Sequence, residues 1–288
     1  MRLNSILPKS IARRLTPERR HTEATQPHNA PEVVLTLPDG RKLTTEELRG
    51  LAGRMTVREG KLLTVTGSVS YEVVGRSSIS AEAESFHQQG RQAGGRGDYK
   101  TAIRLFEQAS EAAPAWPYPV YDKAYTYLLM EDLDAARICY QETLRLSPRG
   151  FFTANVALHT LNREQKGELP RGAYLRYLSL EWMEDKNQRE AAVRALVEQH
   201  PQFAPAWKEF SLLCDNENER LAAIEKGLAA HPDPDTRGML EINKALALNL
   251  LGNRNSALQL LGELALSSES TLGTEHSAKA ALSILLMK

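Results

Sequence analysis

The 288-residue sequence predicts a mainly α-helical protein: a right-handed helical solenoid preceded by a small α+β module rich in β-hairpins. Three observations lead to this prediction. From residue 79 onward, apolar residues recur every three or four positions, as in amphipathic helices. Within that region a set of small, aromatic and proline residues recurs at a fixed interval, which is typical of repeat proteins. Residues 31–80 instead contain short β-branched runs between turn residues, which are typical of strands.

Residues 1–30 are predicted to be a disordered basic tail, because they are polar and prolines and arginines interrupt every apolar run. Apolar side chains between Leu3 and Leu15 nevertheless stand at near-helical spacing beside the arginines. Residues 1–20 therefore leave open a short amphipathic element for a membrane surface, or an organelle-targeting segment.

Residues 31–80 are predicted to form the small β-rich module. A β-branched run at 33–37 is followed by a Pro-Asp-Gly turn and a return at 42–43, which predicts a hairpin. Two threonines and two glutamates then mark a helix start, and this helix would run over 44–54. Further β-branched runs between residues 62 and 74 predict a second hairpin.

The repeat has a constant interval along the sequence. Its small residue, aromatic and proline are Ala102, Phe106 and Pro114, followed by Ala136, Tyr140 and Pro148. With an interval of about 34 residues, this pattern resembles the tetratricopeptide-repeat (TPR) family, in which small residues stand where helices approach closely and a proline ends each pair. The resemblance is firm over 83–150 and 236–266, and looser between them.

The resemblance implies two short arrays joined near Gly167–Pro170, where the register breaks. The first, residues 81–166, would hold two repeats closed by a helix at 151–166. The second, residues 171–288, is more divergent and would end in a capping helix over 274–287. Its expected helix pairs are 171–184 with 187–199, 204–214 with 217–230, and 236–251 with 254–266.

In the TPR family the first helix of each pair lines a concave groove that receives a peptide or a partner helix. Projecting the helical period onto that face gives the candidate partner-binding residues. They are His87, Arg91, Tyr118, Tyr121, Tyr125, Asn155 and His159. Aromatic area beside amide and cationic donors suits binding hot spots. Some of these tyrosines would alternatively pack between helices.

One TPR subgroup grips a C-terminal carboxylate with lysine, asparagine and arginine on this face, and Arg91 and Asn155 match part of that set. His87 stands where that subgroup favours lysine, and tyrosines replace its asparagine. The sequence therefore does not predict such a carboxylate clamp.

Composition and motifs predict neither catalysis nor a cofactor. The 36 basic residues balance 36 acidic ones, so no net charge draws the chain to nucleic acid. Cys139 and Cys214 are expected to be buried free thiols in a reducing, cytoplasmic setting. No CxxC or HExxH motif points to a metal, and the glycine-rich segment 90–97 lacks the Lys-Ser/Thr ending of a phosphate-binding loop.

The resulting functional prediction is a protein-binding scaffold or adaptor rather than an enzyme. One alternative is a membrane- or organelle-associated accessory protein recruited through its basic N-terminal segment. Another is an enzyme with its site in residues 31–80 or between the two arrays, although the sequence offers no acid–base pair for it.

Overall fold

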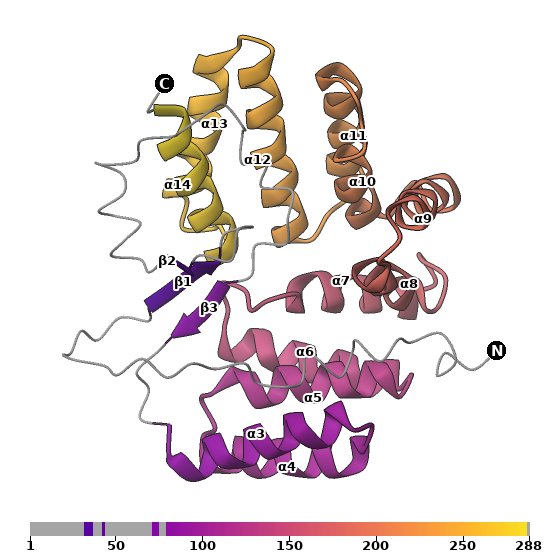
Figure 1. Cartoon of the computed structure of the whole chain (residues 1–288), viewed down its shortest axis with the longest axis vertical. Helices are drawn as coiled ribbons and strands as arrows, with labels where there is room; N and C mark the ends of the chain where they lie inside the picture. Colours follow the sequence, from indigo (N-terminus) through magenta and orange to yellow (C-terminus); the bar gives the residue numbers. More distant parts are fainter. Residues whose placement is uncertain (1–31, 37–41, 44–70, 75–78, 287–288) are drawn as a thin grey trace. The chain divides into compact units, whose positions relative to one another are not determined.

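The computed structural model describes residues 32–36, 42–43, 71–74 and 79–286 (Figure 1). The chain forms two compact units. The helices of the first unit lie within residues 76–184, and those of the second lie within 185–288. The domain limits predicted at 166 and 171 stay a prediction. The predicted tail, residues 1–30, lies outside the described residues.

The N-terminal strands form a small antiparallel sheet. They are β1 (Glu32–Thr36), β2 (Lys42–Leu43) and β3 (Tyr71–Val74), in the order β2-β1-β3. Leu35 of β1 lies opposite Leu43 on one side and Tyr71 on the other. β1 and β2 are thus the strands for which the first hairpin was predicted. The helix and further strand predicted between residues 44 and 70 lie outside the described residues, so the module as a whole stays a prediction.

The first unit is a succession of antiparallel helices (Figure 1). These are α3 (Ala81–Gly95), α4 (Tyr99–Ala112), α5 (Pro117–Leu129), α6 (Leu133–Leu146), α7 (Ala154–Gln165), α8 (Ala173–Ser179) and the 3-10 helix η2 (Leu180–Trp182). α3 packs against α4 and α5 against α6, and α4, α6 and α7 each contact the helix that follows. The two predicted repeats therefore correspond to two helix pairs.

The turn between the helices of each pair recurs at the predicted interval. Asp98 caps α4 by accepting the N–H of Thr101 at 3.2 Å, and Asp132 caps α6 by accepting that of Ala135 at 3.1 Å. The residues just before these caps, Gly97 and Glu131, both have positive φ, at 81° and 62°. The two pairs therefore share one turn geometry, although glutamate adopts this left-handed conformation less readily than glycine.

The buried positions repeat in the same way. Ala102 and Ala136 are fully buried, as are the rings of Phe106 and Tyr140. At the next position of the same repeat, Tyr174 of α8 is fully buried as well. α8 packs on α7 and occupies the place of the second helix in a third, shortened pair. The helix at 151–166 is therefore followed by a second helix rather than closing the array alone.

Glu164 of α7 connects the last two helices of the first unit. Its carboxylate accepts the backbone N–H of Gly172 at 2.7 Å and that of Tyr174 at 2.8 Å. It thereby caps α8, which has no capping side chain of its own. Burial raises the pKa of Glu164, and the two N–H donors, with Arg176 and Arg171, oppose that rise.

The second unit has the pairing that the sequence predicts from residue 204 onward. Its helices are α9 (Lys186–Gln199), α10 (Ala204–Ser211), α11 (Glu217–Ala229), α12 (Pro234–Leu250), α13 (Arg254–Leu266) and α14 (Leu272–Leu286). α10 pairs with α11 and α12 with α13, while α14 packs on both α12 and α13 as the expected final helix. Of the helices predicted to pair over 171–184 and 187–199, α8 belongs to the first unit and packs there on α7, and α9 belongs to the second and packs there on α10.

We expect Gly90→Ala to destabilise the first unit, because the new methyl carbon would lie 2.6 Å from the Phe106 ring. Overpacking of this kind typically costs about 1–3 kcal/mol of unfolding free energy. Gly262→Ala is the matched control, since its methyl group meets nothing within 4 Å. The control should gain up to about 1 kcal/mol from helix propensity. Equal effects of the two changes in urea unfolding would contradict the close packing at Gly90.

The raised pKa of Glu164 predicts an unusual pH dependence. The folded state binds this proton more tightly than the unfolded chain does, so the contribution to stability is lost as pH rises through the folded-state pKa. The wild type should therefore lose stability relative to Glu164→Gln in urea titrations as pH rises above the ordinary pKa of glutamate, about 4.3. Glu142→Gln should show the opposite slope, because the hydrogen bond from Arg145 lowers the pKa of Glu142. If the stability of the wild type instead rises with pH relative to Glu164→Gln, the hydrogen bonds from the α8 amides lower the pKa of Glu164 by more than burial raises it.

Candidate functional site

The first helices α3 and α5 are joined by a buried polar contact. His87 Nε2 lies 2.8 Å from Asp122 Oδ2, and Arg91 Nε lies 3.6 Å from the same oxygen. The Asp122 side chain is 13% exposed and that of Arg91 is 31% exposed, so the arginine is the member that reaches solvent. His87 is buried and has the Trp116 ring 4.7 Å away, edge-on. Two predicted face residues, His87 and Arg91, therefore meet on one aspartate.

Aromatic rings connect α5 to the start of α7. The Tyr118 ring lies edge-on to the rings of Phe151 and Phe152, and the distances between ring centres are 4.8 Å and 5.6 Å. The centre of the Tyr121 ring lies 5.5 Å from that of Phe151, and the Tyr121 hydroxyl oxygen lies 2.9 Å from Thr153 Oγ1. Phe151 is fully buried, while Tyr118, Tyr121 and Phe152 are partly buried. Both tyrosines are therefore held in place and still reach the surface.

The remaining predicted residues occupy different depths. Tyr125 is buried and belongs to the main hydrophobic cluster of the first unit. Asn155 and His159, one helical turn apart on α7, are partly buried. The structure thus places all seven predicted residues on α3, α5 and α7, with His87 and Tyr125 beneath the surface.

Asp122 and Trp116 contact the predicted residues, and the sequence argument did not identify these two. Asp122 follows Tyr118 by one helical turn, so the periodic stripe on α5 carried a signal for it. Trp116 directly precedes Pro117, the first residue of α5. Phe152 has a φ of 47°, a conformation that no sequence pattern here indicates. We call Arg91, Trp116, Tyr118, Tyr121, Phe152, Asn155 and His159 the first-helix face.

The described residues show neither a metal site nor a membrane span. No three His, Cys, Asp or Glu side chains in this part of the chain are grouped so that they could hold a metal ion. No helix within residues 79–286 combines the length and apolar character needed to cross a bilayer. Both cysteines are free and buried, and burial raises their pKa values.

No protein-family model and no curated protein matches this chain. Solved structures to which this chain is similar include MamA 41-end from Desulfovibrio magneticus RS-1, which is 14% identical, with 64% of this chain and 94% of that one covered and a TM-score of 0.31. TTC0263, a thermophilic TPR protein in Thermus thermophilus, is 18% identical over 69% of this chain and 98% of its own, with a TM-score of 0.30. The TPR2AB domain of yeast Sti1 is 16% identical over 73% and 88%, with a TM-score of 0.34.

TTC0263 and the Sti1 domain are TPR proteins by their own descriptions. The repeat in the first unit is a property of this chain itself. The starts of α4 and α6, their aspartate caps, the positive-φ residues before those caps and the buried rings all recur at the same interval.

We expect the His87–Asp122 contact to couple α3 to α5 energetically. Asp122→Ala should lower the unfolding free energy by about 1–3 kcal/mol, because it leaves a buried ring nitrogen without this acceptor. In a His87→Phe background the same change should cost a different amount, giving a coupling energy of about 0.5–3 kcal/mol in a double-mutant cycle. Glu111→Ala, at an exposed site on α4, is the control and should change stability by less than about 0.5 kcal/mol. A coupling energy near zero would contradict the proposed link.

Proposed function

We propose that the chain is a protein-interaction adaptor that binds a peptide or a segment of a partner protein on the first-helix face. The observation that carries this proposal is the set of partly exposed aromatic and polar side chains that successive first helices, α3, α5 and α7, bring to one surface. The right-handed superhelix and its concave groove, which the TPR resemblance implies, are part of the proposal.

The fixed positions of the side chains favour binding. Tyr118 and Tyr121 are held by ring contacts with Phe151 and Phe152, so little side-chain entropy remains to be lost when a ligand contacts them. Arg91 is oriented towards Asp122, and its exposed part can donate further hydrogen bonds. His87 and Tyr125, beneath the surface, would support this arrangement rather than contact the ligand directly.

The residue types indicate a peptide ligand rather than a reaction. The polar members of the face are an arginine from α3 and an asparagine and a histidine from α7, and they are donors and acceptors suited to peptide backbone and side chains. Among solved neighbours, the yeast Sti1 domain is in a complex with pHSP90. For this chain, a cytoplasmic adaptor without enzymatic activity remains our proposal.

The alternative role, recruitment to a membrane or organelle, depends on residues 1–20, which lie outside the described residues. Removing residues 1–30 and following localisation separates the two roles, since an adaptor working only through the first-helix face would keep its distribution.

We expect Arg91→Ala with Asn155→Ala to weaken peptide binding by about tenfold or more, the loss of roughly 1.4 kcal/mol. Peptides would be selected from a displayed random library with the full-length chain, and their affinities measured by fluorescence anisotropy. Arg104→Ala with Gln141→Ala is the matched control, because it also removes one cation and one amide, from exposed sites on α4 and α6.

Circular dichroism and urea unfolding would verify that both double variants remain folded. If the selected peptides bind the Arg91/Asn155 variant as tightly as the wild type, the first-helix face is not the binding surface.

A further inference from the structure

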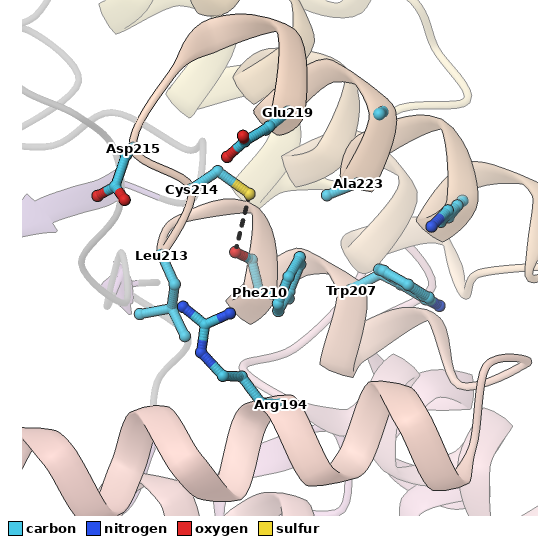
Figure 2. A pocket seen from close by; sticks show the side chains of 10 residues that line it. Arg194, Trp207, Phe210, Leu213, Cys214, Asp215, Glu219 and Ala223 are labelled. Carbon is cyan, nitrogen blue, oxygen red and sulfur yellow. Dashed lines mark hydrogen bonds between the residues drawn. The ribbon is translucent and has the colours of Figure 1, made fainter.

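The second unit contains a groove that the first-helix face does not include. Two adjoining cavities, of about 370 and about 780 Å³, share Arg194, Trp207, Phe210 and Lys226 as lining residues. Arg194 comes from α9, the two aromatic residues from α10, and Lys226 from α11. We call this feature the α10 groove (Figure 2). Cavities of this size accommodate several side chains of a ligand.

Two cations lie on aromatic rings in the α10 groove. The guanidinium carbon of Arg194 lies 5.4 Å from the centre of the Phe210 ring, and Lys226 Nζ lies 5.0 Å from that of Trp207. The indole is itself fixed, because Nε1 donates a hydrogen bond to the Pro201 carbonyl oxygen at 2.7 Å. Figure 2 shows Arg194 reaching from α9 towards Phe210. These cation–π contacts orient both positive groups within the groove.

Within the described part of the chain, neither cation of the α10 groove forms an ion pair with a carboxylate. Glu198 stands one helical turn after Arg194 on α9, yet the guanidinium lies over Phe210 instead. Two other nearby carboxylates have different partners: Glu190 pairs with Lys186 at 3.6 Å, and Glu225 pairs with Lys244 at 2.6 Å. The aromatic rings therefore orient Arg194 and Lys226, and no ion pair with a described carboxylate neutralises their charges.

We propose that the α10 groove binds a short acidic peptide segment of a partner protein. Carboxylates of the segment would pair with Arg194 and Lys226, and an apolar side chain between them would lie on the Phe210 and Trp207 rings. An arginine held flat on a ring presents its N–H edge for paired hydrogen bonds to a carboxylate. Since the rings already hold both cations, little ordering remains to oppose binding.

The groove suits a few carboxylates better than a nucleic acid. Glu198, Asp215 and Glu219 also line the cavities, and all three are exposed. Figure 2 shows Asp215 pointing away from Phe210. High nucleic-acid affinity needs many phosphate contacts. A nucleic acid lying along the groove would bring some of its phosphates next to these carboxylates, which would repel them. A short segment with one or two acidic residues can pair with the cations and avoid the carboxylates.

This proposal goes beyond the adaptor function, because it concerns a different unit and a different set of residues. No residue of the first-helix face lines the α10 groove. A failure of either site therefore leaves the other untouched.

The test uses random peptides of about twelve residues, displayed as a library and selected on the full-length chain. The site variant is Arg194→Gln with Lys226→Gln. The control variant is Lys186→Gln with Arg237→Gln, which removes the same charge from the same unit at side chains that are 86% and 52% exposed and lie outside the groove. Affinities of the enriched peptides, of their Glu/Asp→Gln/Asn counterparts and of a thymidine oligonucleotide are measured by fluorescence anisotropy.

We expect a class of enriched peptides with more Asp and Glu than the unselected library. These should bind the site variant about tenfold or more weakly, bind the control variant as they bind the wild type, and lose a similar factor when their carboxylates become amides. The proposal is overturned if no such class is enriched, if the control variant loses as much as the site variant, or if the oligonucleotide binds the groove more tightly than the peptides. Unchanged thermal unfolding of both variants excludes a folding defect as the cause.

Discussion

The first unit depends on large rings buried against small residues of the neighbouring helix. The Phe106 ring lies so close to Gly90 that a methyl group would not fit between α3 and α4. In the next pair the equivalent small residue is Ala124, which is fully buried, and the equivalent ring is that of Tyr140. Because the ring fills the space between the helices and the small residue allows their approach, this contact sets the spacing of each pair. The turns, caps and surface stripe then follow at the same interval.

The fold was predictable from the sequence where local and periodic signals agree. Repeated small and aromatic residues gave both helix pairs of the first unit, and the pattern over 254–266 matches α13 at both ends. The third pair was not recognised, because a Gly-Glu-Leu-Pro segment interrupts it and α8 is short. Tyr174, one repeat interval after Tyr140, was the available signal. The capping of α8 by Glu164 is a tertiary contact, and helical periodicity contains no information about it.

The candidate surfaces show the same limit. Helical projection places Arg91 and Tyr118 on the same face, but it does not show that His87 and Arg91 both contact Asp122. That requires the distance between α3 and α5. The α10 groove is still less visible in the sequence, since its residues come from three helices and share no spacing. What distinguishes Arg194 there is the ring beneath it, a property of the packing rather than of the residue type.

The uneven distribution of aromatic residues gives the two sets of helices different optical properties. Eight of the nine tyrosines lie between Tyr99 and Tyr177, and the ninth is Tyr71 of β3. Burial raises the pKa values of Tyr140 and Tyr174 well above the ordinary range, so these phenols resist ionisation while the first unit is folded. Trp207 is the sole indole among the helices of the second unit. Among the helices, phenolate absorbance in alkali therefore reports on the first unit, and Trp207, which lies under Lys226, is the one indole that reports on the second.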